Sequence, residues 1–449
     1  MRSTKLTPKK RRLVICSNRL PVSLAWEHDA WQVRASAGGL VTAMGPVLRN
    51  RGGLWIGWPG VVDVDNVQDV LDHGTRGIGY SLVPVPLTAE EEHGFYHGFS
   101  NEVLWPLFHS LQQHCNYDAT YWQAYQKVND KFAEVIAAHL WRDDDIWIHD
   151  YHLMSVGAAL RRLGVSAAIG FFLHIPFPPS HIFQKLPWRR EILESLMHFD
   201  LIGFQTPAHR HNFLESVRYL FNDASINVRG ALHRVTLRNN TLRVGSFPIS
   251  IDYKSFASQT EAPDVQHLVD NVLREVSGTA VMLGVDRLDY TKGIPGKMRA
   301  FRRALELYPE LRRKITLLQV VVPSRGEIPE YYGLKEEIDR LVGEIGGEFS
   351  EPGWTPIVYM YRSLTRQELL AYYRASRIAL ITPLEDGMNL VAKEYCACSD
   401  QDNSVLILSE FAGAAQELGV GALLVNPNDM DGLAEAIRAA YTMKLTERR

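Results

Sequence analysis

The chain has 449 residues, of which 46% are hydrophobic and 22% charged, a composition typical of a globular protein. Domains usually hold about 100–200 residues, so this length predicts more than one core. The net charge of -3 at pH 7 excludes a general attraction to nucleic acid or to anionic membranes. Any phosphate-binding site must therefore be built locally.

The amino end, residues 1–12, is strongly basic and resembles the start of a secretion signal. The apolar run after it, residues 13–16, is far shorter than the roughly 7–15 apolar residues of such a signal, and no stretch reaches the about 18 apolar residues of a membrane span. The 4 cysteines are scattered without paired metal-ligand spacing, as in proteins of a reducing compartment. We therefore expect a cytoplasmic protein with a solvated basic tail. A nucleic-acid-binding arm is the alternative, which the lack of interleaved aromatic residues disfavours.

Short apolar runs followed by polar side chains recur through the first half of the chain and predict buried strands. Ser-Asn-Arg follows the first run, where a dinucleotide-binding protein would show its glycine pattern, which counts against a nicotinamide or flavin enzyme. Ligands bind at the carboxyl ends of strands in open parallel sheets. We therefore expect a ligand beside Arg19, Asp150 and His174, each of which follows such a run. A buried structural role for His174 is equally compatible with the sequence.

Three other groups in this half have both a structural and a functional interpretation. Gly38 and Gly39 precede a helix-like segment, where backbone N–H groups can approach a ligand, although such a pair more often forms only a turn. Tyr96 and Trp105 lie in an aromatic stretch that is expected mainly in the core, yet both side chains can donate to phosphate oxygens. The acids at 143–145 precede a strand, so we expect a solvated loop there and not a metal site.

Cations follow two predicted strands in the second half of the chain. Residues 280–285 lead into a turn that contains Arg287 and Lys292, and residues 315–322 lead to Arg325. Two cations that flank a turn could bind a diphosphate, and they could equally be solvated charges on the surface.

The stretch from Ile378 to Glu394 predicts a strand, an acidic turn and a helix. The strand breaks at Pro383, and the turn contains Asp386. Unpaired N–H groups at the helix start bind anions. Asp386, together with Glu394 about two turns into the helix, would hold hydroxyl groups on either side of a phosphate, as a nucleotide sugar requires.

Strands alternate with helices in both halves of the chain, and the pattern restarts near residue 250. This predicts two α/β domains, residues 1–250 and 251–449, built on doubly wound parallel sheets that face one another across a cleft. The local cations and acids favour transfer between phosphorylated sugars.

Eleven motifs occur in order from Ser17 to about Pro427: SNR, SAGGL, FSNEVLWPLFH, WIHDYHL, FFLHIPFP, LIGFQT, RLDYTKG, PSRGE, GWTP, TPLEDGMNLVAKEY and LSEFAGAA. With this set the chain resembles the trehalose-6-phosphate synthase family of retaining glycosyltransferases. The resemblance implies two Rossmann-like domains in a GT-B arrangement, the first binding the acceptor and the second the nucleotide sugar. It implies that glucose passes from UDP-glucose to glucose 6-phosphate, giving trehalose 6-phosphate and UDP, with no metal and no cofactor.

The resemblance also implies roles for individual residues. The acceptor's phosphate would be held by Arg19, Tyr96, Trp105 and Arg325, and its hydroxyls by Asp150. The donor would be bound by Gly38, Gly39, His174, Arg287, Lys292, Leu364, Asp386, Asn389, Leu390, Val391 and Glu394. Asp150, His174, Arg287, Lys292 and Asp386 would form the catalytic group, in a front-face mechanism in which the leaving diphosphate accepts the proton of the incoming hydroxyl.

Several alternatives stay open at this point. The acceptor could be that of glucosylglycerol-phosphate synthase or of validoxylamine-phosphate synthase, although both depart from the motifs here, and an inactive sugar-phosphate-binding relative is a further alternative. Asp150 and Asp386 as a glycosidase pair are disfavoured by the surrounding cations. The base of the donor and a homo-oligomeric state are not fixed by the sequence. Family members usually continue past LTERR into a helix that returns to the first domain, so we expect weaker domain closure in a chain ending at Arg449.

Overall fold

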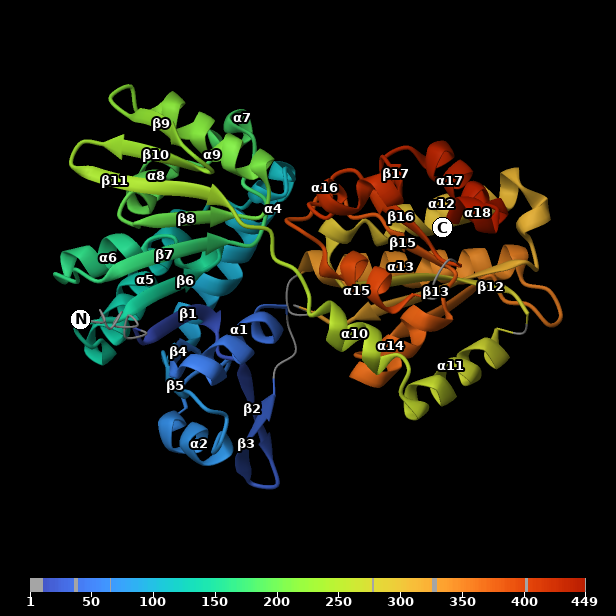
Figure 1. Ribbon diagram of the computed structural model, residues 1–449, viewed down its shortest axis with the longest axis horizontal. Helices are drawn as coiled ribbons and strands as arrows, with labels where there is room; N and C mark the ends of the chain where they lie inside the picture. The colour runs from blue at the N-terminus through green and yellow to red at the C-terminus, as the bar shows by residue number, and fades with distance from the viewer. Residues whose placement is uncertain are drawn as a thin grey trace, which may run out of the picture. The chain divides into compact units, whose positions relative to one another are not determined.

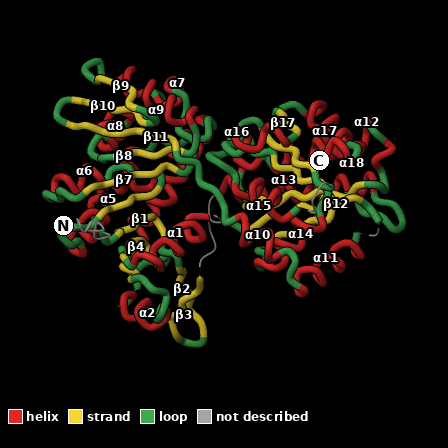
Figure 2. Tube along the Cα trace, in the orientation of Figure 1, coloured by secondary structure: helices red, strands yellow, loops and turns green. Residues whose placement is uncertain are grey.

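A computed structural model describes residues 11–35, 39–64, 66–276, 278–324, 329–399 and 403–448. The chain divides into two compact units, Met1–Pro248 and Ile249–Arg449. Each unit contains a mostly parallel sheet accompanied by helices (Figures 1 and 2). The assignment of the acceptor to the first unit and of the donor to the second stays a prediction.

The first unit is built on a nine-stranded sheet of order β5-β4-β1-β6-β7-β8-β11-β10-β9. The strands from β5 to β11 run parallel, and β10 and β9 continue the sheet antiparallel, so β10 and β11 form a hairpin. The order of the first six strands is that of a doubly wound fold. The bounds are β1 (Leu13–Arg19), β4 (Gly53–Trp58), β5 (Ser81–Pro84), β6 (Asp145–His149), β7 (Ala168–Leu173), β8 (Leu201–Phe204), β9 (Ser225–Arg229), β10 (Leu232–Leu237) and β11 (Asn240–Ser246).

The connections of the first unit are mainly helical, apart from the separate hairpin of β2 (Val22–Glu27) and β3 (Ala30–Ala35). Most unusual is η1 (Glu92–Leu104), a π-helix of 13 residues, because such helices are rare and concentrate at functional sites. The other bounds are α1 (Gly39–Arg51), α2 (Val67–Gly74), α3 (Ala89–Glu91), α4 (Trp105–Phe108), η2 (Gln112–His114), α5 (Ala119–His139), η3 (Tyr151–Leu153), α6 (Val156–Arg162), α7 (Ser180–Phe183), α8 (Arg189–Leu196) and α9 (Pro207–Leu220).

The second unit has a six-stranded parallel sheet of order β14-β13-β12-β15-β16-β17, which is again doubly wound. Its strands are β12 (Ala280–Arg287), β13 (Ile315–Val322), β14 (Ile357–Tyr361), β15 (Ile378–Ile381), β16 (Val405–Ser409) and β17 (Leu423–Val425). Its helices are α10 (Tyr253–Gln259), α11 (Pro263–Glu275), η4 (Tyr290–Lys292), α12 (Ile294–Leu307), η5 (Pro309–Leu311), α13 (Pro329–Phe349), α14 (Arg366–Ala375), α15 (Leu390–Cys398), α16 (Ala415–Leu418), η6 (Gly419–Gly421), α17 (Met430–Thr442) and α18 (Leu445–Arg448).

The core of the second unit lies on both faces of its sheet. Along β13, Leu317 and Val321 belong to one apolar cluster, whereas Leu318 and Val320 belong to the other. Side chains alternate between the faces of a strand, and parallel sheets are covered on both faces. The continuous apolar runs that predicted these strands follow from this double burial.

Some expected boundaries were wrong. The strands expected at 13–16 and 280–285 continue to Arg19 and Arg287. Backbone pairing extends to Arg19–Trp58 and Arg287–Val322, because backbone hydrogen bonds do not require apolar side chains. The acidic run at 143–145 was expected to be solvated, yet Asp144 is buried and 2.5 Å from Arg12. Residues 1–10 of the basic tail lie outside the described residues.

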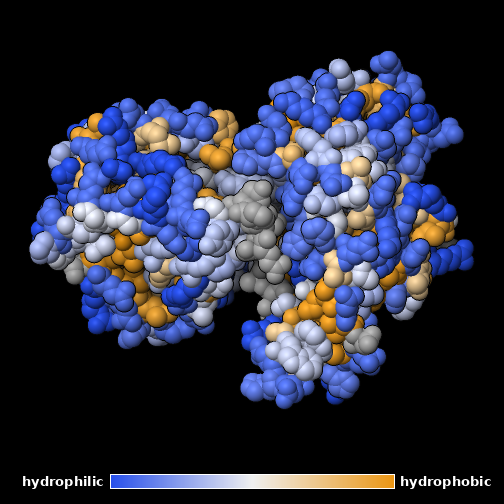
Figure 3. All heavy atoms as spheres, turned by 180° about the vertical axis from the view of Figure 1, so that it is seen from behind, coloured by the Kyte–Doolittle hydropathy of each residue, from blue (hydrophilic) through white to orange (hydrophobic). Residues whose placement is uncertain are grey.

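The outer face shown in Figure 3 is mainly hydrophilic, with smaller apolar areas on both units. Within the described ranges, no helix is both long and apolar enough to cross a membrane.

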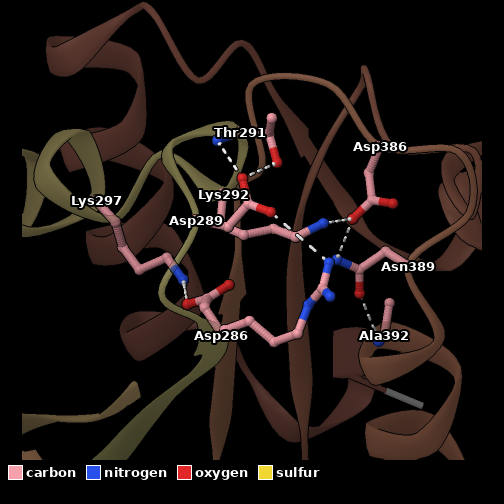
Figure 4. Close-up of polar contacts among 9 residues, drawn as sticks. Asp286, Asp289, Thr291, Lys292, Lys297, Asp386, Asn389 and Ala392 are labelled. Atoms are coloured by element: carbon pink, nitrogen blue, oxygen red, sulfur yellow. Dashed lines mark hydrogen bonds and ion pairs between the residues drawn. The ribbon is translucent and has the colours of Figure 1, made fainter. Parts of the chain in front are cut away.

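A buried ion pair joins β12 to α12 in the second unit. Lys297 Nζ lies 2.5 Å from Asp286 Oδ2, and the two side chains are 0% and 3% exposed (Figure 4). Gln319 on β13 donates a further hydrogen bond of 2.9 Å to the same oxygen. The carboxylate is thus compensated for its loss of water. The burial of Lys297 was not predicted from the sequence, since a lysine on an amphipathic helix is usually exposed.

Replacing Lys297 with methionine is expected to lower the free energy of unfolding by about 3–5 kcal/mol, because Asp286 would stay buried without its cation. The double variant Asp286→Asn/Lys297→Met should recover most of this loss, since no buried charge remains. Urea titration measures both values. Arg299→Met, which removes an exposed ion pair with Glu337 from the same helix, is the control and should change stability by less than about 1 kcal/mol. A single variant as stable as the wild type would contradict this.

Candidate active site

Polar side chains gather where the strand order of each sheet reverses. In the first unit this point lies between β1 and β6, where Arg19 ends β1 and Asp150 follows β6. In the second unit it lies between β12 and β15, where Arg287 ends β12 and Asp386 follows β15. Ligands of doubly wound sheets bind at this topological switch point. Four of the residues predicted from the sequence therefore lie at the two expected positions.

An exposed arginine lies against aromatic rings in the first unit. The guanidinium carbon of Arg19 is 3.9 Å from the ring centroid of Trp58 and 5.4 Å from that of Tyr96. Gly60 has a φ of +86°, which favours glycine, and a Cβ there would lie 1.8 Å from Arg19 Nη1, so a larger residue would displace the guanidinium. Cation–π attraction to the two rings helps to hold the guanidinium in this position. Trp58 and Gly60 were not predicted from the sequence, although Trp-Pro-Gly directly after an apolar run was an available signal.

The π-helix positions Tyr96, while Trp105 is the first residue of α4. Asn101 donates to the carbonyl of Tyr96 five residues earlier, at 2.7 Å, and its own amide oxygen accepts from the Tyr151 hydroxyl at 3.0 Å. Tyr96 is half-buried and stacks on His152, with ring centroids 6.0 Å apart. Trp105 is only 5% exposed, and its ring centroid lies 4.3 Å from that of His109. The structure thus brings Tyr96 to Arg19, whereas Trp105 lies against the rings of His109 and Tyr151.

Asp150 and His174 are held together at the ends of β6 and β7. Asp150 has a φ of 76° and a ψ of 168°, a strained conformation for a residue with a side chain. Its Oδ1 accepts from the backbone N–H of His174 at 3.2 Å, and His174 Nε2 lies 3.1 Å from His149 Nδ1. Burial lowers the pKa of His174 below its ordinary value. Burial also lowers the pKa of His149, to well below its ordinary value. Both rings are therefore neutral at pH 7.

An ion pair connects the turns that follow β12 and β15. Lys292 Nζ lies 2.6 Å from Asp386 Oδ2, and the two side chains are 12% and 16% exposed (Figure 4). Asn389 donates to the same oxygen at 3.2 Å, has a φ of 76°, and accepts at 3.2 Å from the N–H of Ala392. A cation, an acid and the cap of α15 are thus held in one network.

Arg287 forms an ion pair within the turn that follows β12. Its Nη2 lies 3.7 Å from Asp289 Oδ2, while Asp289 Oδ1 accepts from the N–H and hydroxyl of Thr291 at 3.0 and 2.8 Å. The carbonyl of Thr291 in turn accepts from the N–H of Leu384 at 2.8 Å. The turn is consequently fixed by its own cap and by the segment that leads to Asp386.

The loop that contains Asp386 packs against the turn that follows β16. Ala414 donates its N–H to the carbonyl of Met388 at 2.7 Å. A Cβ at Gly413 would lie 2.1 Å from the carbonyl oxygen of Gly387, so only glycine allows the two backbones to approach this closely.

The start of α15 lies beside Asp386, as the sequence predicted. The first N–H groups of a helix lack partners within it, so those of Leu390 and Val391, its first two residues, face the region before the helix. Glu394 is the fifth residue of α15, about one turn into the helix and not two, because the helix begins only at Leu390. Leu364 is half-buried, packs against the core of this unit and precedes α14.

The structure describes one of three further residues that were predicted to contact a ligand. Gly38 and Arg325 lie outside the described residues, whereas Gly39 begins α1.

Glu394 is a partly buried acid with one neutral donor. The hydroxyl of Tyr373 donates to Glu394 Oε2 at 2.8 Å. Burial raises the pKa of Glu394 above its ordinary value, although Tyr373 and Arg366 both oppose the increase, and burial likewise raises the pKa of Tyr373.

Glu394→Gln should therefore increase the melting temperature at pH 8, and this gain should shrink at pH 5. A carboxyl with a raised folded-state pKa destabilises the fold where it is ionised, and it does so no longer where the folded and unfolded states are both protonated. Calorimetry at the two pH values measures the difference. The exposed Glu410→Gln is the control, with the same small effect at both. A gain that grows toward low pH would show that ionised Glu394 is stabilised.

Comparison with known proteins identifies the family. A model described as glycosyltransferase family 20 matches residues 11–449. The chain is 45% identical to a bifunctional trehalose-6-phosphate synthase/phosphatase of Thermoproteus tenax, and the match covers 97% of this chain and 59% of that protein. It is 43% identical to a trehalose-6-phosphate synthase of Mycolicibacterium smegmatis, and the match covers 97% of this chain and 86% of that protein. The chain thus spans less than two thirds of some curated relatives, including the 58% covered of a Dictyostelium discoideum enzyme.

Solved structures agree with this result. A UDP-forming alpha,alpha-trehalose-phosphate synthase from Burkholderia xenovorans, in complex with glucose-6-phosphate, is 37% identical with a TM-score of 0.88, over 97% of this chain and 93% of that one. An E. coli structure bound with UDP-2-fluoro glucose is 37% identical with a TM-score of 0.87, over 97% and 92%. The predicted α/β class with two Rossmann-like domains of the GT-B fold is confirmed. The chain belongs to glycosyltransferase family 20.

Proposed function

We propose that the chain is a retaining glucosyltransferase that moves glucose from UDP-glucose to glucose 6-phosphate, forming trehalose 6-phosphate and UDP. The observation that carries the proposal is the Lys292–Asp386 ion pair at the switch point of the second sheet, with Arg287 at the end of the adjoining strand. Cations at this edge suit a diphosphate, and an acid beside them suits the hydroxyls of the sugar attached to it.

The names of the relatives support the choice of substrates. The Burkholderia xenovorans enzyme is a UDP-forming trehalose-phosphate synthase solved with glucose-6-phosphate, and the E. coli protein is bound with a fluorinated UDP-glucose. Both align with nearly the whole of this chain, and both are themselves covered almost completely.

On the donor side, Arg287 and Lys292 would bind the diphosphate, together with the N–H groups at the start of α15. Asp386 and His174 would hold the transferred glucose, and Glu394 the ribose. The remaining donor contacts of the proposal are Gly38, Gly39, Leu364, Asn389, Leu390 and Val391. Asn389 would act mainly by capping α15 and holding Asp386, as its two hydrogen bonds indicate.

On the acceptor side, Arg19 would bind the phosphate of glucose 6-phosphate. Its residue is exposed and its guanidinium carbon lies over the Trp58 ring, so its N–H donors need little ordering when an anion binds. Tyr96 beside it would donate a further hydrogen bond, with Trp105 and Arg325 completing the phosphate contacts. Asp150 would hold hydroxyl groups of the acceptor sugar.

The reaction would proceed on one face of the donor sugar. The bond from the anomeric carbon to the diphosphate breaks, the anomeric hydroxyl of the acceptor forms the new bond, and its proton passes to the departing diphosphate oxygen. Arg287 and Lys292 would stabilise the charge that grows on that oxygen. A glycosidase would need two carboxylates flanking the bond, whereas Asp386 is already paired with Lys292.

We further propose a cytoplasmic location, which the four free cysteines support, because free thiols are typical of a reducing compartment. The proposal requires no metal or organic cofactor, since cationic side chains supply the charge for the leaving group.

The direct test is a UDP-release assay with UDP-glucose in the presence of glucose 6-phosphate, glucosyl acceptors without phosphate, or glycerol 3-phosphate. Release is expected only with glucose 6-phosphate. Turnover with glycerol 3-phosphate would favour the glucosylglycerol-phosphate alternative, and no turnover with any acceptor would favour an inactive relative. GDP-glucose and ADP-glucose in the same assay establish the base preference.

Arg287→Ala and Lys292→Ala should each lower kcat by about 100-fold or more, the effect of removing one group that stabilises a growing charge. KM for glucose 6-phosphate should change little, because neither cation contacts the acceptor in this proposal. Arg299→Ala, an exposed cation on α12, is the control and should keep the wild-type kcat. An unchanged kcat in Lys292→Ala would rule out its role on the leaving group.

A further inference from the structure

We propose that His149 is a positioning residue, which holds the His174 ring in the tautomer that carries its hydrogen on Nδ1. His174 would then offer an N–H donor to the transferred sugar. The inference rests on the proposed function for the role of His174, but the tautomer itself is a property of the ligand-free protein.

His149 is enclosed by the centre of the first sheet. It is the last residue of β6, is 1% exposed, and pairs in register with Ser17 on β1 and Phe172 on β7. Its ring centroid lies 4.8 Å from that of Trp147 and 5.3 Å from that of His174. A ring placed in this way has little freedom to turn.

The polar atoms of His149 leave two arrangements for the neutral pair. Its Nδ1 is 3.1 Å from His174 Nε2, and its Nε2 is buried with no hydrogen-bond partner among the residues that the structure describes. In the first arrangement, His149 Nδ1–H donates to His174 Nε2, and His149 Nε2 is a bare lone pair. In the second, His174 Nε2–H donates to His149 Nδ1, and His149 Nε2 must carry a buried hydrogen without an acceptor.

The first arrangement is favoured because the buried atom that it leaves without a partner, His149 Nε2, is an acceptor and not a donor. An N–H donor buried without an acceptor is rarer in proteins than an acceptor that lacks a donor. Burial lowers the pKa of both rings, so neither takes up a second proton that would make the choice irrelevant. With His174 Nε2 accepting, its only hydrogen lies on Nδ1.

His174 is then fixed at two points. Its backbone N–H is held by Asp150 at 3.2 Å and its ring by His149 at 3.1 Å. An imidazole ring can either donate or accept at the free nitrogen, and the partner at the other nitrogen decides which. His149 thus selects a donor that suits a sugar hydroxyl oxygen.

Long-range nitrogen–proton NMR on the ligand-free protein, labelled with ¹⁵N-histidine, tests the tautomers directly. Both His149 and His174 are expected as neutral rings protonated on Nδ1. His149→Phe assigns the His149 signals. A His174 ring protonated on Nε2, or a charged ring at pH 7, would overturn the inference whatever the activity of the enzyme.

A matched pair of variants tests the consequence for catalysis. Asparagine can place an amide N–H near the position of Nδ1–H, whereas aspartate has the same shape but only accepts. His149→Asn should keep kcat within about fivefold, and His149→Asp should lower it by about 10–100-fold, as loss of an orienting partner does at other sites. His149→Asp should also draw a hydrogen onto Nε2 of His174, since the carboxylate only accepts.

Equal losses of kcat in the two variants, with the His174 tautomer unchanged, would show that only the shape of His149 matters. A wild-type protein that has the expected tautomers but releases no UDP would refute the proposed function and leave the tautomer assignment standing.

Discussion

The hydrogen-bonded ion pair between Lys292 and Asp386 is the interaction on which the second unit's site depends. Its atoms are 2.6 Å apart, and it connects two turns that are 94 residues apart in the sequence. Such charge-assisted bonds are short and strong, and a mostly buried one loses little to screening by salt. The pair holds the cation and the acid at one switch point before any ligand arrives. The diphosphate would then share Lys292 with Asp386 and would not have to order a free side chain.

Each unit has a non-glycine residue with a positive φ next to its switch point. Asp150 in the first and Asn389 in the second each have a φ of 76°, and both are residues with side chains. Such strain is maintained only where surrounding contacts fix it, and it is concentrated at functional sites. Asp150 is held through the N–H of His174, and Asn389 through Asp386 and Ala392. In both units the strained residue orients an acid that the proposed mechanism places on a sugar.

Local sequence patterns predicted the fold well, because a parallel sheet buried on both faces leaves continuous apolar runs such as 315–322. The strand ends were less predictable, since Arg19 and Arg287 belong to strands through backbone pairing alone. The sequence also located Asp386 and Lys292, but it gave no sign that they touch. Trp58, Gly60 and Lys297 were missed because their importance comes from contacts with residues distant in the chain. The resemblance to a family supplied the individual roles that patterns alone left open.

The most direct test of the central claim follows the labelled sugar itself. UDP-glucose carrying ¹³C at the anomeric carbon is incubated with glucose 6-phosphate and the enzyme, and the product is examined by NMR. We expect one labelled disaccharide phosphate in which this carbon keeps the α configuration and is bonded to the anomeric oxygen of the acceptor, with one UDP formed for each molecule. Labelled free glucose, or a β-linked product, would contradict a retaining transfer to glucose 6-phosphate.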